Sequence, residues 1–380
     1  EFAIVPLFIL MGHIATRSGI SAALFSTSNA WIGHLRGGLA MASVAGCAMF
    51  GSISGSSLAT ASTMARVALP EMRKAGYSGA ISAGSLAAGG TLGILIPPSI
   101  VLIIYALLTE QNIVKLFLAA TIPGLLAVAG FFIAIAIYVR IFPGEAPRQA
   151  KAPLSVRIKS LGEVWHIVLI FVIVLGGIYG GFFTPAEGAS VGVVLTLLIG
   201  FTTRKLTPRA LVECLIDTAA SSAMIFAIVF GADIFNVALA LSRMPIEVAD
   251  FFSGVNIAPM WILLAMIAFY LVMGCVMDSL SMILLTVPVF FPTVMALDFG
   301  LMPEQQAMWF GIITLVVVEM GLITPPVGMN LFVISSMAKD IPTSQIFRGA
   351  TPFIIAEFVR IAILVSFPVL SFWLVDLVAN

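Results

Sequence analysis

Two short sequence patterns each occur twice in this chain at one common separation. Residues 46–49 read Gly-Cys-Ala-Met, and residues 274–277 read Gly-Cys-Val-Met. Likewise, Gly-Ile-Leu-Ile-Pro-Pro at 93–98 matches Gly-Leu-Ile-Thr-Pro-Pro at 321–326. Both matches are offset by 228 residues, which chance does not readily produce. The chain is therefore expected to fold as two related units.

Composition indicates the solvent around these units. Apolar residues make up 61% of the chain and charged residues 9%, whereas soluble domains carry about 25% charged residues. Lipid tolerates such a surface, and helices satisfy their own backbone polar groups there. We therefore expect an all-α polytopic membrane protein in contact with phospholipid. The net charge is zero, so no nucleic-acid partner is expected.

Basic residues orient the membrane spans, because loops rich in Lys and Arg stay in the cytoplasm. The polar segment 140–163 holds five of them and is assigned to the cytoplasm. Alternating spans then place the C-terminus on the outer face of the membrane. The first apolar run, residues 2–16, is short for a span of about 20 residues. Part of the native N-terminus is therefore expected to be missing.

The two repeated units are expected to have opposite orientations. Segment 38–70 is flanked by basic residues at both ends, so both ends are cytoplasmic, whereas segment 257–297 is assigned to the outer face at both ends. Each segment has small polar residues at its middle and is predicted to be a re-entrant helical hairpin. Each is followed by a helix broken at a Pro-Pro pair, at 77–109 and 304–338. The sequence therefore predicts an inverted repeat.

The two repeats divide the chain into repeat segments and flanking segments. The repeats are expected at 38–109 and 257–340. The flanking segments are expected at 1–37, with one helix and an interfacial arm; at 110–222, with helices, an arm helix and the cytoplasmic loop 140–163; at 223–256, with a connecting helix; and at 341–380, with a C-terminal helix.

The interruptions in the repeats carry the chemistry. The hairpin middles read Gly-Ser-Ile-Ser-Gly-Ser-Ser at 51–57 and Met-Asp-Ser-Leu-Ser at 277–281. Proline breaks the helix and frees backbone carbonyl groups, which need partners. Carbonyl and hydroxyl oxygens suit a hard cation, and helix N-termini suit a carboxylate. We expect one cation site per repeat and an organic anion between the tips. Close helix packing is the alternative for either element alone.

These motifs resemble the large (DctM-type) membrane subunit of tripartite ATP-independent periplasmic (TRAP) transporters. The resemblance rests on the Ser-rich tip at 51–56, on Ile-Pro-Pro-Ser at 96–99 and on the run at 321–332. It implies sodium-coupled uptake without ATP and substrates such as dicarboxylates, sialic acids, keto acids or sugar acids. It also implies an elevator-type fold like that of the ion-transporter superfamily, in which the repeats 38–109 and 257–340 form a transport domain and the flanking segments form a scaffold. It also implies two partners, a small four-helix membrane subunit (DctQ-type) and a periplasmic substrate-binding protein. Two or more Na⁺ ions, and no organic cofactor, are expected.

The resemblance also implies site residues. The first sodium site is expected at Ser52, Ser54, Ser56, Ser57, Gly93 and Ile96. The second is expected at Asp278, Ser279, Gly321, Thr324 and Gly328. The substrate is expected at Ser54, Ser56, Pro98, Ser99, Pro326 and Asn330. Arg66 is added to this set for its charge on the returning arm of the first hairpin, where it would either meet the anion or extend to the membrane interface.

Three further patterns are independent of the resemblance. Glu319 lies deep in apolar sequence, where an acid is functional by default; the alternative is that it only orients the neighbouring helix break. Glu357 and Arg360 are three positions apart and are predicted to pair on one helix. Thr184 and Glu187 form a capping-box pattern at a helix start.

Three rival functions remain open at this stage. A stand-alone sodium and divalent-anion symporter would share the architecture but need no binding protein. An intramembrane enzyme could use Asp278 with Asp233, although neither lies in a recognisable catalytic motif, and we expect no enzyme activity. A passive channel would not concentrate its substrate.

Overall fold

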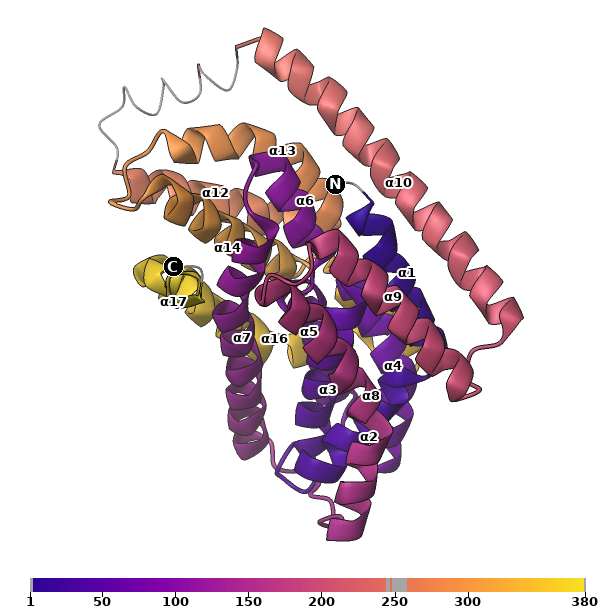
Figure 1. Cartoon of the computed structure of the whole chain (residues 1–380). Helices are drawn as coiled ribbons and strands as arrows, with labels where there is room; N and C mark the ends of the chain where they lie inside the picture. The colour runs from indigo at the N-terminus through magenta and orange to yellow at the C-terminus, as the bar shows by residue number, and fades with distance from the viewer. Residues whose placement is uncertain (1–2, 244–246, 248–257, 379–380) are drawn as a thin grey trace.

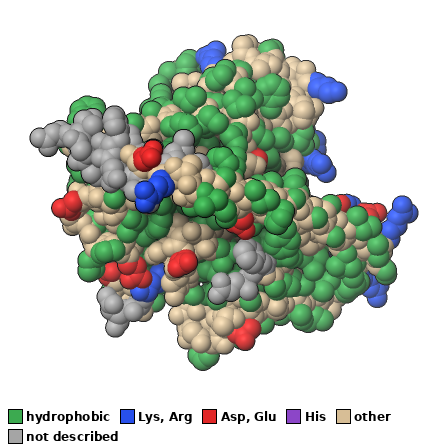
Figure 2. Space-filling view, turned by 90° about the horizontal axis from the view of Figure 1, so that it is seen from above, with side chains coloured by type: hydrophobic (Ala, Val, Ile, Leu, Met, Phe, Trp, Pro, Cys, Tyr) green, Lys and Arg blue, Asp and Glu red, His purple; other side chains and the backbone are tan. Residues whose placement is uncertain are grey.

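The computed structural model describes residues 3–243, 247 and 258–378, and the regular structure there is helical (Figure 1). Within the described residues, five helices are long and apolar enough to cross a membrane, and two bent helix pairs add further candidate spans. The five are α7 (Ile113–Ile141), α8 (Leu154–Tyr179), α9 (Pro185–Thr202), α10 (Pro208–Leu241) and α16 (Thr343–Ser366). The face drawn in Figure 2 carries many hydrophobic and few charged side chains. The expected all-α polytopic fold is confirmed.

Both expected hairpins are present as pairs of packed helices. The first consists of α3 (Gly38–Ser54) and α4 (Ser57–Lys74), and the second of α12 (Pro259–Gly274) and α13 (Ser279–Met295). At the first tip, Gly55 has a φ of 61°, a conformation that favours glycine. In Figure 1, α3 and α4 lie in the lower half of the molecule and α12 and α13 in the upper half. The hairpins therefore approach each other from opposite ends.

Each hairpin is followed by a helix that breaks at its Pro-Pro pair. The first is α5 (Gly79–Leu95) with α6 (Ile100–Thr109), bent by 42°. The second is α14 (Pro303–Gly321) with α15 (Met329–Met337). Proline has no N–H to continue the helical hydrogen bonds, so both breaks follow from the sequence.

The sequence match between residues 46–49 and 274–277 does not correspond to equivalent positions in the two hairpins. Residues 46–49 lie inside α3, before its end, whereas residues 274–277 form the tip of the second hairpin. The equivalent positions are Ser57 and Ser279, the first residues of the returning arms, which are 222 residues apart. The Pro-Pro breaks keep the offset of 228. The linker between the hairpin and the broken helix absorbs part of the difference, since it spans 75–78 in one copy and 296–302 in the other.

Each hairpin crosses its broken helix at a pair of glycines. A Cβ atom added to Gly51 would lie 2.3 Å from Cα of Gly93. A Cβ atom added to Gly321 would lie 2.6 Å from Cα of Gly274. Only glycine allows backbones to approach this closely. These contacts fix each tip beside the break in its own repeat.

Helices α7 and α16 pack directly against the first broken helix, although the sequence assigned both to the scaffold. A Cβ atom on Gly349 of α16 would lie 1.9 Å from the carbonyl oxygen of Ala80 in α5. Gly124 of α7 faces Leu95 and Ile96 at the α5 break, where a Cβ atom would have 3.3 Å contacts. Helices α7 and α16 therefore both pack closely on α5.

One other expected boundary differs in the structure. α10 is continuous from Pro208 to Leu241, so it crosses the boundary expected between 222 and 223. The segment 1–37 contains two helices, α1 (Ile4–Arg17) and α2 (Ile20–Ile32), which are bent by 66°. The chain ends in a short 3-10 helix, η1 (Pro368–Ser371), and in α17 (Trp373–Val378). The outer end of the expected connecting segment, at 248–256, lies outside the described residues.

The predicted capping box at the start of α9 is confirmed. The Thr184 hydroxyl accepts from the Glu187 backbone N–H at 3.3 Å, and the Glu187 carboxylate accepts from the Thr184 N–H at 2.8 Å. Replacing Thr184 with alanine should lower the free energy of unfolding by about 1 kcal/mol. Thermal unfolding in detergent measures this change. An unchanged midpoint would mean that the cap contributes nothing at this lipid-facing helix.

Candidate functional site

A cavity of about 280 Å³ lies between the two hairpin tips. The first hairpin contributes Ser54 to Ala59 and the second contributes Asp278 to Leu280. The facing wall comes from α1 and α10, through residues that include His13 and Ser221. The fold therefore brings together two polar segments that lie more than 200 residues apart in the sequence.

The carboxylate of Glu319 connects the tips at the centre of the molecule. The Ser57 hydroxyl, at the start of α4, donates to Oε2, and the Ser279 hydroxyl, at the start of α13, donates to Oε1 at 2.6 Å. Glu319 itself is on α14 and only 1% exposed. The functional role expected for this acid is therefore consistent with its position, although the sequence did not place it in either sodium site.

The first tip gathers oxygen atoms around the Ser54 side chain. Ser54 Oγ lies 2.7 Å from Thr60 Oγ1, 3.3 Å from the carbonyl oxygen of Gly51 and 3.5 Å from that of Ser56. Ser56 caps α4 by accepting from the Ala59 N–H at 3.4 Å. Hydroxyl and carbonyl oxygens are the ligands that a hard cation takes. The oxygen atoms at this tip are therefore of the kind that a hard cation takes.

The second tip is built around Asp278, the N-cap of α13. Its carboxylate accepts from the backbone N–H of Ser281 at 3.1 Å and from the Ser281 hydroxyl at 2.5 Å. The tip is held against the second break, because the Gly328 N–H donates to the Cys275 carbonyl at 3.2 Å. Asp278 supplies a full negative charge at the cavity, and its oxygens also fit a cation.

The structure brings only some of the predicted site residues to the cavity. Ser54, Ser56, Ser57, Asp278 and Ser279 line it. The other predicted residues do not line it: Ser52, Gly93, Ile96, Gly321, Thr324, Gly328, Pro98, Ser99, Pro326, Asn330 and Arg66.

Several of these remaining residues have structural partners. Ser99 caps α6 by accepting from the Leu102 N–H at 3.3 Å. Asn330 is buried and donates to the carbonyl oxygen of Ala87 in α5 at 3.1 Å. Arg66 is exposed on α4, away from the cavity lining. The expectation that Arg66 meets the substrate has no support from this geometry.

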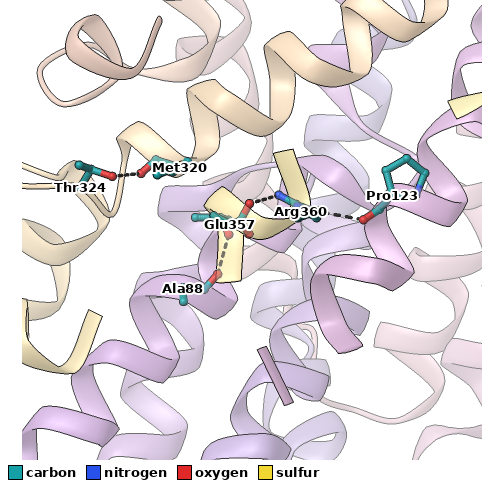
Figure 3. Close-up of polar contacts among 7 residues, drawn as sticks. Ala88, Pro123, Met320, Thr324, Glu357 and Arg360 are labelled. Carbon is teal, nitrogen blue, oxygen red and sulfur yellow. Dashed lines mark hydrogen bonds and ion pairs between the residues drawn. The ribbon is translucent and has the colours of Figure 1, made fainter. Parts of the chain in front are cut away.

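At the second break, one predicted sodium ligand forms a hydrogen bond with the helix that precedes it. The Thr324 hydroxyl donates to the carbonyl oxygen of Met320 at 2.6 Å (Figure 3). The neighbouring Pro325 and Pro326 are exposed, whereas Pro97 and Pro98 of the first break are buried. The two predicted cation sites are therefore not equally enclosed.

The predicted pair of Glu357 and Arg360 is confirmed, and it is buried. Arg360 contacts the Glu357 carboxylate and also donates to the Pro123 carbonyl oxygen of α7 at 3.3 Å (Figure 3). The two side chains are 2% and 4% exposed. This pair ties α16 to α7 and does not line the cavity.

Sequence reasoning missed the residues on the opposite wall and one residue at the tip. His13, Thr16 and Ser221 line the cavity from α1 and α10, yet they form no motif with one another. Thr60 lies one turn after Ser57 on α4, so helical spacing could have linked it to the tip. No residue pattern indicated which helices face the tips.

Comparison with known proteins gives a consistent match over nearly the whole chain. Residues 1–370 match the family model described as "Tripartite ATP-independent periplasmic transporter, DctM component". The chain is 35% identical over 368 residues to the C4-dicarboxylate TRAP transporter large permease protein DctM of Pseudomonas aeruginosa, covering 97% of this chain and 84% of that protein. It is 32% identical over 379 residues to the sialic acid TRAP transporter large permease protein SiaM of Vibrio cholerae, covering 98% and 86%.

A solved structure shares the fold. The YdaH transporter of Alcanivorax borkumensis, described as having an unusual topology, superimposes with a TM-score of 0.70. The match covers 98% of this chain and 85% of that one, at 14% sequence identity. This likeness supports the architecture alone.

Proposed function

Since the chain belongs to the DctM component family of tripartite ATP-independent periplasmic transporters, we propose that it carries a small organic anion across the bacterial inner membrane, driven by a sodium gradient. The observation that carries this proposal is the cavity between the two hairpin tips. Both tips end in a helix N-terminus that borders the cavity, α4 on one side and α13 on the other. Such N-termini favour an anion.

The proposed substrate class is a carboxylate. Two relatives are named for a C4-dicarboxylate and for sialic acid, and both compounds carry this group. Among the described residues, no Lys or Arg lines the cavity, so serine hydroxyls and backbone N–H groups would bind the carboxylate. Asp278 and the oxygen cluster around Ser54 would hold sodium ions and so offset the substrate's charge.

We further propose an elevator-type movement. The moving body would contain both hairpins and both broken helices, together with α7 and α16, because these two helices pack on α5. The fixed wall would be α1 with α8, α9 and α10. Exposed apolar side chains on α8 and α10, such as Trp165 and Phe230, would face phospholipid or the small four-helix membrane subunit. A periplasmic binding protein would deliver the substrate to the face that also carries the C-terminus.

Replacing Asp278 with asparagine tests the cation site. Asparagine caps a helix as well as aspartate does, so α13 should persist while the negative charge is lost. We expect uptake into proteoliposomes to fall about tenfold or more at a fixed sodium gradient, because losing a charged contact costs about 1.4 kcal/mol or more. The measurement is uptake of labelled dicarboxylate and sialic acid, with the partner proteins present, as external sodium is varied.

Thr184→Ala is the matched control, because Thr184 caps α9 outside the cavity. It should leave the sodium titration unchanged. An Asp278→Asn variant with the normal sodium titration would contradict the cation site. Uptake by the unaltered protein without sodium would contradict the coupling itself. Uptake without any binding protein would favour the stand-alone symporter instead.

A further inference from the structure

One side chain bridges the two halves of the proposed site. Glu319 accepts from Ser57 of the first hairpin on one carboxylate oxygen and from Ser279 of the second hairpin on the other. Both serines also line the cavity. The hairpins enter from opposite ends, so this bridge joins the tips where the two inverted repeats meet.

The bridge is asymmetric with respect to the repeat. The position equivalent to Glu319 in the first broken helix, at the offset of 228 residues, is Thr91. The Thr91 hydroxyl donates within its own helix, to the Ala88 carbonyl oxygen at 2.6 Å. One broken helix therefore supplies the bridging group, and the other contributes none at that position.

No ion pair to Glu319 is present among the residues that the structure describes, although the side chain is 1% exposed. Its two oxygens are held by the two serine hydroxyls, each a donor from a different tip. A buried carboxylate without a counter-ion depends on such donors. The serines and Glu319 therefore constrain each other's positions.

We propose that Glu319 is a positioning residue that holds the two tips together as one unit, so that a change at one tip is transmitted to the other. This inference rests on the proposed function, in which sodium ions bind at the Ser54 cluster and at Asp278, because Ser57 and Ser279 belong to the same two tips. The bridge makes the sodium response of the two halves cooperative. Without it, each tip responds independently.

The direct test measures the distance between the tips. Leu58 and Leu280 follow the two serines and line the cavity, so Leu58→Cys and Leu280→Cys place spin labels beside the bridge. The three native cysteines are buried and stay in place, with a control that lacks the two introduced cysteines. Pulsed electron–electron double resonance on the full chain in nanodiscs, with its small subunit, then gives the distribution of distances between the two spin labels.

Two replacements of Glu319 distinguish the effect of its hydrogen bonds to the two serines from the effect of its negative charge. Glutamine retains an oxygen that accepts from one serine and an NH₂ group that donates to the other, so Glu319→Gln should keep a narrow distribution. Leucine has a similar size but bonds to neither serine, so Glu319→Leu should broaden the distribution. An unbroadened Glu319→Leu distribution overturns the proposal. If that variant does not fold, Ser57→Ala and Ser279→Ala each remove one donor, and an unbroadened distribution in both overturns it equally.

A second readout concerns transport. The Hill coefficient for sodium should fall to about 1 in Glu319→Leu and recover in Glu319→Gln, with at least a tenfold loss of uptake in the leucine variant. A Hill coefficient that stays at the unaltered value in Glu319→Leu overturns the coupling role. Sodium-independent uptake by the unaltered protein contradicts the proposed function alone, because the distance measurement needs no sodium.

Discussion

Replacing Arg360 with alanine should lower the free energy of unfolding by about 3–5 kcal/mol. The change leaves the Glu357 carboxylate buried without its cation, since Glu357 is 2% exposed. It also removes the donor to the Pro123 carbonyl oxygen and so the link from α16 to α7. Thermal unfolding in detergent, followed by tryptophan fluorescence, measures the effect. Trp309 is a suitable reporter, because its indole N–H donates to the Leu364 carbonyl oxygen of α16 at 2.9 Å.

A surface pair of identical spacing serves as the control. Lys74 pairs with Glu71 three positions earlier at 2.7 Å, and both side chains are exposed. Lys74→Ala should therefore cost less than about 1 kcal/mol. The double replacement Glu357→Leu with Arg360→Met should cost less than Arg360→Ala, because no unpaired charge remains. Equal losses for Arg360→Ala and Lys74→Ala would show that the buried pair does not stabilise the bundle.

Replacing Gly349 with alanine should also destabilise the protein strongly, by about 3 kcal/mol. The added Cβ atom would lie 1.9 Å from the Ala80 carbonyl oxygen, which is backbone and cannot rotate away. Helices α16 and α5 would have to separate, and the buried pair with Arg360 on α16 would shift with them. The midpoint of thermal unfolding, together with elution as a single species, measures this loss.

Gly130→Ala is the matched control in a neighbouring helix. The nearest atom to its added Cβ would be Cβ of Ala356 at 3.9 Å, an ordinary contact distance. Alanine should stabilise that helix interior by about 0.5–1 kcal/mol, because glycine loses more backbone freedom on folding. If both alanine variants unfold at the same temperature, the close approach of α16 and α5 is not required for stability.

Much of the architecture followed from local sequence. The Pro-Pro pairs broke the helices where they were expected to, and the Ser-rich and Asp-containing segments became tips with capped helix starts. These features depend on groups within a few residues of each other, so sequence alone could indicate them. The offset of 228 residues was correct at the breaks but wrong within the hairpins, where the linkers differ in length.

The composition of the site depended on contacts that sequence does not contain. Ser57, Ser279 and Glu319 come from three separate helices, and although each was singled out in the sequence, no pattern indicated that they meet. The assignment of α7 to the scaffold was based on chain order, yet Gly124 places this helix against the α5 break. Arg66 was a candidate because of its charge, and its exposed position on α4 removes the reason for choosing it.

The sequence by itself determined that the chain is suited to a lipid environment, that it is helical, that it contains an inverted repeat, and where the four interruptions lie. Each is set by composition or by backbone chemistry that acts over a few residues. Only the tertiary structure decided that the two tips share one carboxylate, that α1 and α10 close the cavity, and that α16 is fastened to α5 and α7. Those relations depend on glycine contacts and buried hydrogen bonds between segments far apart in the chain, where side-chain geometry selects the partner.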